Sequence, residues 1–342
     1  MLSDEHFMAR CLQLAQLGRR VVAPNPMVGA VIVYEDQIIG EGYHAVYGGP
    51  HAEVNAIRSV KDSALLSKAT IYVSLEPCSH FGKTPPCADL LIQNSFRRVV
   101  IGTRDPNVQV DGRGIERLEK AGIAVRSGVM EKECRALNRH FYTYHEKKRP
   151  YIVLKWAQTP NGLIDNDVQP GGIAWISQPE TQDYVHQLRA SLHGILVGRK
   201  TVLKDNPRLT VRKVEGINPV RIVLDSQLRL DKNASVFSND GTTIVLNTVK
   251  TEKNGSIEYR RIDAMDVSQI CTALYEEGIQ SVLVEGGKAT LQSFIDAGLW
   301  DEARRITGQH NFTSGTAAPQ LHGTRFKTER YFGDTIETYL NS

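Results

Sequence analysis

This sequence of 342 residues lacks the features that mark membrane and secreted proteins. Its longest apolar runs, such as Val28 to Tyr34 and Tyr151 to Leu154, fall far short of the roughly 20 residues needed to cross a bilayer. The first residues contain no basic stretch followed by an apolar one, so no secretory signal is indicated. These absences predict a cytoplasmic protein with no membrane partner.

The sequence also has few cysteines and a small net charge. The five cysteines are an odd number and do not suggest the disulfide framework of a small secreted domain. A net charge of +3 is well below the strongly basic profile of a nucleic-acid-binding protein, so we expect no nucleic-acid partner. No Gly-x-Gly-x-x-Gly follows an expected strand, and the residues alone therefore reveal no dinucleotide site of the usual kind.

The chain is long enough for two globular domains, at about 100 to 200 residues each. Between two patterned regions lies the polar segment Tyr144 to Pro150, which includes the only basic triplet, Lys147-Lys148-Arg149. We interpret this segment as a solvated linker and place the boundary near residue 148. The expected domains are residues 1–147 and 148–342.

Both regions alternate helices with strands. In the first, strands are expected at 28–34, 37–41, 71–75, 98–102 and 123–126, and helices after Ser3 and at 52–60, 88–93 and 114–121. The first two strands should form a hairpin around Glu35-Asp36. In the second region, strands are expected at 151–157, 194–197, 220–224, 243–246 and 281–284, with a helix at 180–191. The fold class is therefore α/β in both domains, the first being an α/β sandwich.

The residues most suited to chemistry lie in two segments of the first domain. His51, Cys78 and Cys87 offer one imidazole and two thiolates, which hold zinc at three corners of a tetrahedron and leave the fourth open to water. Zinc makes such a water nucleophilic near neutral pH. Glu53, two residues after the histidine, is the natural proton shuttle. His-x-Glu followed by Pro-Cys is typical of zinc deaminases.

The spacing of the cysteines departs from the usual deaminase pattern, because eight residues separate them instead of two. Cys78 follows a β-type run, and Cys87 can begin a helix, so both thiolates should lie near positive helix starts. A structural zinc site is an alternative, with His80 as the only ready fourth ligand. A zinc-braced interaction module is another, although such a site has no use for Glu53. A nucleic-acid editing deaminase is a third, but it should show a basic groove and aromatic residues for a flipped base.

The second domain carries a pair of glycines at a place where a phosphate could bind. Glu285-Gly286-Gly287 stands between a strand and a helix that begins near Lys288. Small residues there let a phosphate reach the backbone amides at the helix start. A simple strand-to-helix turn is the plainer explanation of Gly-Gly when it is taken alone.

Long motifs run through both halves of the chain. They are Asn25 to Gly29, Gly42 to His44, His51 to Glu53, Leu75 to Cys87, Leu154 to Ala157, Trp175 to Ser177, Leu188 to Ala190, Thr201 to Arg212 and Val284 to Gly287. Together they resemble the bacterial bifunctional riboflavin biosynthesis deaminase-reductase family, to which the eight-residue gap also belongs. The resemblance implies a cytidine-deaminase-like α/β/α sandwich followed by a dihydrofolate-reductase-like α/β domain.

The resemblance also implies two reactions. The first domain would deaminate 2,5-diamino-6-(5-phosphoribosylamino)pyrimidin-4-one with one zinc ion per chain. The second would use NADPH to reduce the ribosyl group to ribityl. The partner would be a small phosphorylated pyrimidine, and the sequence allows a homo-oligomer without requiring one.

Site residues follow from the same resemblance. In the first site, the implied substrate contacts are Asn25, His44, His80 and Lys83. In the second site, the implied cofactor contacts are Gln158, Trp175, Thr201, Asp205 and Gly287, and the implied substrate contacts are Arg189, Leu209, Arg212 and Glu285. The residue types agree, because an asparagine can read a pyrimidine edge and the forked donors of arginine suit a phosphate. Each residue taken alone also has a structural explanation, such as a turn for Asn25 or the core for Trp175.

Two motifs depart from the family pattern. Thr159-Pro160-Asn161-Gly162 replaces Ser-Leu-Asp-Gly, which puts the cofactor contacts around Gln158 in doubt, although the segment still suits a turn. Asp105-Pro106-Asn107-Val108 replaces Asp-Pro-Asn-Pro, and we attach no functional consequence to it.

One lysine lies in an otherwise apolar strand. Strand alternation places Lys155 on one face with Val153 and Ala157, which argues against a simple solvent-facing side chain. Reduction of a ribosylamine needs a proton donor as the sugar ring opens, and we predict that Lys155 is this catalytic residue. Asp205 and Glu285 would orient the ribose or assist the proton transfer. The alternative is a lysine whose stem merely covers apolar surface.

Overall fold

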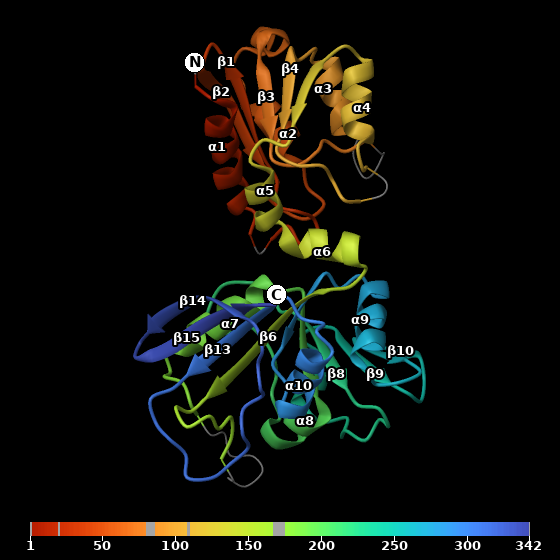
Figure 1. Cartoon of the computed structure of the whole chain (residues 1–342). Helices are drawn as coiled ribbons and strands as arrows, with labels where there is room; N and C mark the ends of the chain where they lie inside the picture. The colour runs from red at the N-terminus through yellow and green to blue at the C-terminus, as the bar shows by residue number, and fades with distance from the viewer. Residues whose placement is uncertain (1, 20, 80–85, 108–109, 167–174, 342) are drawn as a thin grey trace. The chain divides into compact units, whose positions relative to one another are not determined.

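A computed structural model describes residues 2–19, 21–79, 86–107, 110–166 and 175–341. The chain divides into two compact units, Met1–Lys147 and Lys148–Ser342 (Figure 1). Each unit has its own sheet and its own apolar clusters. Among the described residues, no helix is both long enough and apolar enough to span a bilayer.

The first unit is built on a five-stranded sheet. In spatial order, its described strands are β2 (Gln37–Tyr43), β1 (Gly29–Tyr34), β3 (Thr70–Val73), β4 (Arg98–Ile101) and β5 (Ala124–Ser127). The helices are α1 (Asp4–Gln16), α2 (Ala52–Ser59), the 3₁₀ helix η1 (Ser63–Lys68), α3 (Cys87–Gln93), α4 (Arg113–Lys120), α5 (Glu131–Leu137) and α6 (Arg139–Lys147). Strand β1 is antiparallel to both of its neighbours, whereas β3, β4 and β5 are mutually parallel.

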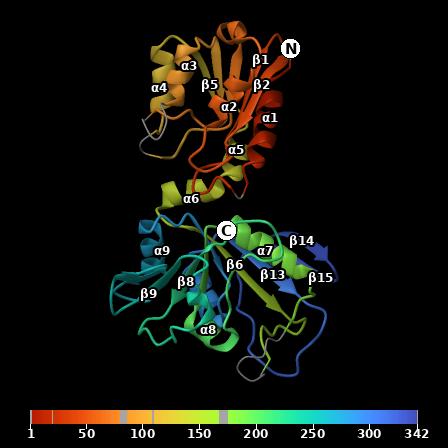
Figure 2. The same cartoon turned by 180° about the vertical axis from the view of Figure 1, so that it is seen from behind.

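Helices cover both faces of this sheet, which makes the unit the expected α/β/α sandwich (Figures 1 and 2). Val31, Tyr72 and Val100 point to the face packed against α1 and α5. Their neighbours Ile71 and Val99 point to the opposite face, against α2, α3 and α4. Because successive strand residues alternate between faces, these strands are apolar on both sides.

The predicted hairpin between the first two strands is present. Glu35 and Asp36 both adopt left-handed backbone conformations, with φ of 49° and 60°. Two such residues form a tight turn whose twist matches that of the flanking strands. Tyr34 therefore pairs with Gln37 across the turn.

The predicted solvated linker at residues 144 to 150 is only partly present, because Glu146, Lys147 and Lys148 are exposed but the segment up to Lys147 is helical. Helix α6 continues to Lys147 because Phe141 and Tyr142, earlier in the same helix, pack against Leu75. Beyond the helix, the Arg149 side chain is only 12% exposed and donates two hydrogen bonds to Asp301, at 2.6 and 2.8 Å. These tertiary contacts, which a local reading of polar residues misses, order the segment.

The second unit contains a ten-stranded sheet. In spatial order, its described strands are β10 (Glu252–Asn254), β11 (Ile257–Arg261), β9 (Thr243–Asn247), β8 (Val220–Leu224), β7 (Gly194–Gly198), β12 (Ser281–Val284), β6 (Tyr151–Gln158), β13 (Glu302–Thr307), β15 (Asp334–Leu340) and β14 (Thr324–Tyr331). Its helices are α7 (Thr181–Ser191), α8 (Arg199–Asp205), the 3₁₀ helix η2 (Ser235–Phe237), α9 (Val267–Glu276) and α10 (Lys288–Asp296). Neighbouring strands from β11 to β13 are parallel, and antiparallel pairs occur at both edges.

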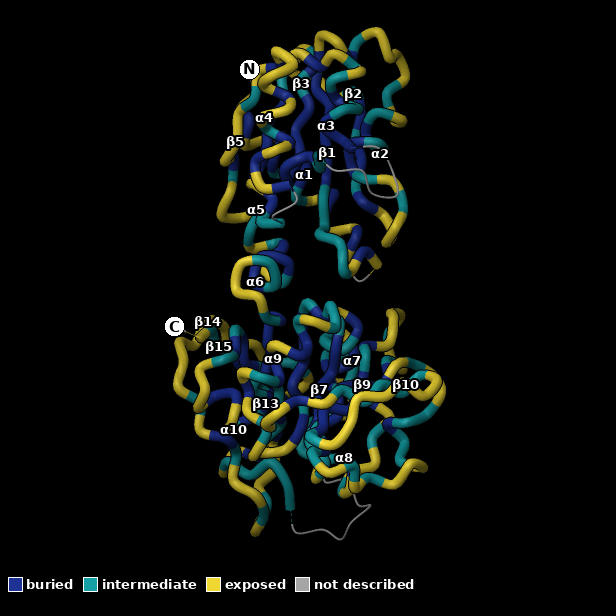
Figure 3. Tube along the Cα trace, turned by 90° about the vertical axis from the view of Figure 1, so that its right-hand side faces the viewer, coloured by how far each residue is buried: buried dark blue, intermediate teal, exposed yellow. Residues whose placement is uncertain are grey.

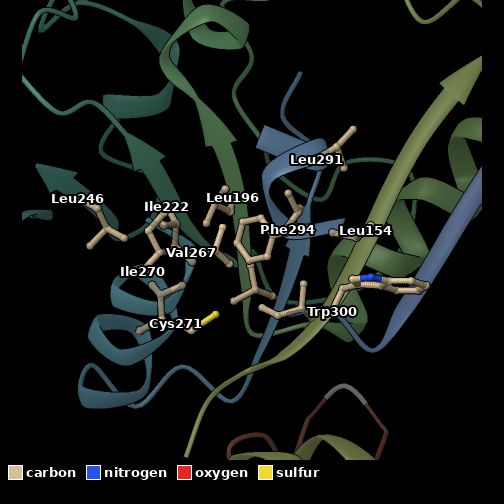
Figure 4. Packing of buried hydrophobic residues seen from close by; sticks show 14 of the residues in the cluster. Leu154, Leu196, Ile222, Leu246, Val267, Ile270, Cys271, Leu291, Phe294 and Trp300 are labelled. Carbon is tan, nitrogen blue, oxygen red and sulfur yellow. The ribbon is translucent and has the colours of Figure 1, made fainter. Parts of the chain in front are cut away.

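Apolar side chains cover both faces of the central strands of this sheet, and Figure 3 shows the buried residues concentrated in the strands. On one face, α9 and α10 supply Ile270 and Phe294, which pack against strand residues such as Leu196 and Ile222 (Figure 4). On the other face, Leu188 of α7 and Val202 of α8 join a second cluster. Lys155 extends from β6 toward this second face, the one covered by α7 and α8.

Candidate active sites

The first candidate site brings together His51, Cys78 and Cys87. His51 immediately precedes α2, and Cys87 is the first residue of α3. The His51 Nδ1 atom lies 3.2 Å from the Cys87 Sγ atom and 3.7 Å from the Cys78 Sγ atom. All three ligand atoms lie within 4.8 Å of one another. This is a donor set that one zinc ion can satisfy, as the sequence predicts.

Hydrogen bonds link the three side chains of this triad. The hydrogen bond from Cys87 lowers the pKa of Cys78, burial opposes this effect, and the hydrogen bond from His51 adds to it. The hydrogen bond to Cys78 raises the pKa of His51 to about 9 and also raises the pKa of Cys87. A backbone N–H of Cys87 donates to the Cys78 Sγ atom at 3.2 Å, which further favours a thiolate. Zinc binding would displace the shared protons.

Glu53 lies in the first turn of α2, two residues after His51, and is only 3% exposed. Burial raises the pKa of its carboxyl group, while the nearby charge of His51 opposes that rise. Glu53 also shares a hydrogen bond with Cys87. A buried carboxyl group beside the metal ligands can take up and release a proton near neutral pH more readily than an exposed one.

His44 and Asn25 lie beside this triad. The His44 Nδ1 atom is 3.0 Å from the carbonyl oxygen of Pro50, and because a carbonyl only accepts, Nδ1 carries the proton. The His44 Nε2 atom then accepts a hydrogen bond from Asn25 Nδ2 at 3.1 Å. Asn25 therefore keeps its carbonyl oxygen as the acceptor that it can offer to a pyrimidine amine. The rings of His44 and His51 are 5.6 Å apart, which brings this pair to the metal ligands. His80 and Lys83 lie outside the described residues.

Glu76 organises the backbone behind the triad, and the sequence did not single it out. Its buried carboxylate accepts hydrogen bonds from four backbone N–H groups, of Asp105, Gly112, Gly114 and Ile115, at 3.0 to 3.2 Å. These bonds tie the segment after β4 to the residue two before Cys78. Burial raises the pKa of Asp105 in the same segment to about 7. The only local signal was an acidic residue at the end of an apolar strand.

The second candidate site is a cavity of about 1180 Å³ in the second unit. Eight of the residues implied by the family resemblance or by the strand pattern line it. They are Lys155, Trp175, Arg189, Thr201, Asp205, Arg212, Glu285 and Gly287. Trp175 is 63% exposed, so it is not a core residue. The cavity therefore joins residues from β6, α7, α8 and the segment after β12.

Two implied contacts do not line this cavity. Gln158, at the end of β6, accepts a hydrogen bond from Trp156 Nε1 at 2.8 Å. The Leu209 side chain is buried in the cluster beneath α8, and its backbone is left-handed with φ of 57°. Their roles as ligand contacts stay predictions.

Lys155, Arg189 and Glu285 form a buried charge cluster in the cavity wall. Arg189 donates from Nε to Glu285 Oε1 at 3.1 Å and from Nη2 to Glu285 Oε2 at 2.7 Å. The Lys155 Nζ atom lies 3.9 Å from the same Oε2 atom. Burial alone would raise the pKa of Glu285, but Arg189 and Lys155 outweigh it and lower that pKa to about 2. Burial lowers the pKa of Lys155, and Glu285 opposes this effect.

The Gly-Gly pair after β12 permits a close backbone approach beside the cavity. A Cβ atom on Gly286 would lie 2.6 Å from both the Val197 Cα and the Gly198 N atoms, so no other residue fits without movement. Gly287 has a φ of 27°, and a Cβ atom on it would meet Thr201 Oγ1 at 3.3 Å. The start of α10 is thereby held against the start of α8, where both helices line the cavity.

The segment Thr159 to Gly162, which departs from the family motif, still forms a turn. Gly162 N donates to Thr159 O at 2.9 Å, and Gly162 has a φ of 79°. Asn161 Nδ2 donates to Phe312 O at 2.8 Å. Further along, Asp165 forms an ion pair with Lys204 of α8 at 2.5 Å, and both residues line the cavity.

Comparisons with known proteins connect both sites to one family. Residues 1–103 match the cytidine and deoxycytidylate deaminase zinc-binding region, and residues 150–308 match the RibD C-terminal domain. The riboflavin biosynthesis protein RibD of Aquifex aeolicus is 42% identical over 305 residues, which cover 87% of this chain and 85% of that protein. The chain belongs to the RibD family.

Other RibD proteins agree with this assignment. RibD of Escherichia coli K12 is 39% identical over 320 residues, covering 88% of this chain and 86% of that protein. The crystal structure of a diaminohydroxyphosphoribosylaminopyrimidine deaminase/5-amino-6-(5-phosphoribosylamino)uracil reductase from Thermotoga maritima is 38% identical, with a TM-score of 0.88 and 99% of each chain covered. Acinetobacter baumannii RibD has a TM-score of 0.89 at 30% identity and the same coverage.

Membership of the RibD family confirms the predicted fold and the predicted pairing of a zinc-dependent deaminase with a reductase in riboflavin biosynthesis. The residues also fit the two cofactors. His51, Cys78 and Cys87 provide the soft and borderline donors that zinc prefers. The reductase cavity, lined by Arg199, Lys200 and the glycine turn after Glu285, suits the phosphates of NADPH.

Proposed function

We propose that this chain catalyses two successive reactions. The first unit deaminates 2,5-diamino-6-(5-phosphoribosylamino)pyrimidin-4-one, and the second reduces the ribosyl group of the product to ribityl with NADPH. The observation that carries the proposal is the presence, in one chain, of a His-Cys-Cys triad beside buried Glu53 and of a cavity in which Lys155 lies against Glu285. The similarity to RibD proteins supports the choice of substrate.

In the first unit, zinc held by His51, Cys78 and Cys87 would lower the pKa of a bound water and so supply the nucleophile for the carbon that carries the departing amine. Glu53 accepts a proton from this water and returns protons to the ring nitrogen and the leaving amine. Its burial favours the protonated form, which makes the return of the proton easier. Asn25 offers its carbonyl oxygen to the pyrimidine, because its amide nitrogen already donates a hydrogen bond to His44.

In the second unit, NADPH supplies the hydride. Lys155 donates a proton to the ring oxygen of the ribose, and the bond between that oxygen and C1′ breaks to leave a protonated imine. Addition of hydride at C1′ neutralises the protonated imine and leaves a secondary amine, with no further proton needed at the nitrogen. Glu285 stays ionised and cannot be the donor, because Arg189 and Lys155 hold its pKa at about 2. Burial makes Lys155 a stronger acid than a free lysine, which suits the donor role.

We propose a cytoplasmic enzyme that acts on a diffusible small molecule and needs neither nucleic acid nor a membrane. The three cysteines outside the zinc site, Cys11, Cys134 and Cys271, are buried and form no disulfide, which fits a reducing compartment. Sedimentation analysis would determine whether the chain forms a homo-oligomer.

The proposed boundary near residue 148 makes the deaminase separable. Residues 1–147 form a compact unit with their own apolar clusters, so a protein of this length should fold, bind zinc and release ammonia. Insoluble or zinc-free protein from several end points near residue 147 would show instead that the second unit is needed for folding.

The whole proposal is tested by supplying the phosphorylated diaminopyrimidinone to the purified, zinc-loaded chain. Ammonia should be released first, and NADPH oxidation should follow with an equal total yield. NADPH oxidation that precedes ammonia release would contradict the proposed order. Ammonia release without any NADPH oxidation would contradict the reductase assignment.

A further inference from the structure

His186 lies in the wall of the reductase cavity, and the reaction described above gives it no role. It shares one face of α7 with Gln182 and Arg189, at spacings of four and three residues, and all three line the cavity. The His186 side chain is only 4% exposed. A buried imidazole at this position needs a hydrogen-bonding explanation.

The hydrogen bond on one ring nitrogen defines the state of the other. The backbone N–H of Arg212 donates to His186 Nδ1 at 3.2 Å. Because a backbone N–H can only donate, Nδ1 must be unprotonated, and a neutral ring then carries its proton on Nε2. Burial, followed by the charges of Arg189 and Arg212, lowers the pKa of His186 to about 4, so the neutral ring persists at physiological pH.

The neighbouring cations are not equivalent. Arg189 uses Nε and Nη2 to hold Glu285, and its Nη1 atom lies 3.4 Å from the carbonyl oxygen of Thr210. Among the described residues, the Arg212 guanidinium donates one hydrogen bond, from Nη1 to Thr210 Oγ1 at 3.0 Å. Arg212 is therefore the better placed of the two arginines to bind a phosphate group, and the backbone of Arg212 is what His186 holds.

We propose that His186 is a positioning residue of the reductase site: Nδ1 fixes the Arg212 backbone against α7, and Nε2–H donates to the phosphoribosyl end of the substrate. This inference rests on the proposed reductase function. A neutral donor beside a cation is suited to this end of the substrate, because it adds a hydrogen bond without adding a charge that must be buried.

Two substitutions separate the two nitrogens of His186. In His186→Asn, the side-chain amide reaches the position of Nδ1, so the acceptor for Arg212 is kept and the donor is lost. In His186→Gln, the amide reaches the position of Nε2, so the donor is kept and the acceptor is lost. His193→Asn is the matched control, since His193 Nδ1 also accepts a backbone N–H, from Gln280 at 3.4 Å, but His193 does not line the cavity.

Four quantities are measured for each full-length protein: the KM for the deaminated substrate, the reductase kcat, the Ki of ribose 5-phosphate as a competitor, and the Kd for NADPH from tryptophan fluorescence. For His186→Asn, we expect KM and Ki to rise together by about tenfold, the effect of losing one hydrogen bond to a charged group. The kcat and the Kd for NADPH should stay within twofold. His186→Gln should also raise KM, because Arg212 loses its anchor, and His193→Asn should change none of the four.

The inference is overturned if KM and Ki in His186→Asn stay within twofold of the parent values, or if kcat falls while KM is unchanged. An unchanged KM in His186→Gln would overturn the anchoring role of Nδ1. A parent chain that oxidises no NADPH would instead overturn the proposed reductase function itself, so the two failures are distinguishable.

Discussion

Arg189 holds Glu285 through two parallel hydrogen bonds, with 3.1 Å between Nε and Oε1 and 2.7 Å between Nη2 and Oε2. The same carboxylate lies 3.9 Å from Lys155 Nζ. Arg189 thereby fixes the anion that faces the proposed proton donor. Because all three side chains are largely buried, the geometry of this cluster determines how Lys155 meets the substrate.

The paired hydrogen bonds predict that Arg189→Lys slows the reductase. A lysine keeps the charge but offers a single point donor, so Glu285 loses its fixed orientation. We expect the reductase kcat to fall about 10- to 100-fold, the equivalent of one charged hydrogen bond of about 1.5 to 3 kcal/mol, with ammonia release unchanged. Arg149→Lys is the matched control, because Arg149 also grips a carboxylate through two bonds, to Asp301, and does not line the cavity. An unaltered kcat in Arg189→Lys would show that Glu285 needs no such partner.

Lys155→Met should abolish NADPH oxidation and leave deamination intact. Methionine retains the apolar stem of the lysine and removes the proton that we assign to ring opening. The deaminated substrate, prepared with the parent enzyme, is supplied to the variant, and absorbance of NADPH is followed. If the variant reduces this substrate at an ordinary rate, Lys155 is structural and another group supplies the proton.

Glu53→Gln should keep the fold and the zinc while ammonia release falls by about 10²- to 10⁴-fold, since a general acid-base residue contributes a factor of that order. Metal analysis and ammonia release are measured on the same sample. Glu41→Gln is the control, because Glu41 forms its ion pair with Arg10, on part-exposed side chains of the same unit. Near-normal ammonia release from Glu53→Gln would remove this residue from the mechanism.

The purified chain should carry one zinc ion, and removing it should stop only the first reaction. His51, Cys78 and Cys87 belong to the first unit, whereas the reductase cavity is lined by residues of the second. After chelation, NADPH oxidation with preformed deaminated substrate should continue at its former rate. Elemental analysis that finds no zinc, or ammonia release that survives chelation, would contradict the metal site.

His186 predicts how stability depends on pH. The pKa of His186 is about 4 in the folded chain and near 6.5 in the unfolded chain. Between these two pH values the imidazole is protonated in the unfolded state but neutral in the folded state. Stability is therefore full above about pH 6.5 and falls as the pH decreases toward 4. Urea unfolding at pH 7.5 and pH 5 should show a smaller loss for His186→Asn than for the parent. Equal losses in the two proteins would mean that His186 does not resist protonation.

Much of the fold follows from local sequence, because strand alternation and helix spacing are set by neighbouring residues. The strands at the centre of both sheets are apolar on both faces and were predicted within one or two residues. The antiparallel strands β15 and β14, at one edge of the second sheet, were not predicted. Strand β14 has exposed side chains along almost its whole length and so lacks any apolar alternation, and it is a strand because it pairs with β15.

The sequence by itself predicted the zinc donors and Glu53, since His-x-Glu and Pro-Cys place groups of known chemistry near the starts of expected helices, and the structure brings the three donors together. Alternation within one strand also placed Lys155 on the same face as Val153 and Ala157. Only the tertiary structure decided which partners these groups meet. Arg189 reaches Glu285 across 96 residues of chain, and His186 reaches the backbone of Arg212 across 26. A buried charge is paired only if folding brings a partner that is distant in sequence close to it in space. That proximity is set by how helices and strands pack, which no local sequence pattern encodes.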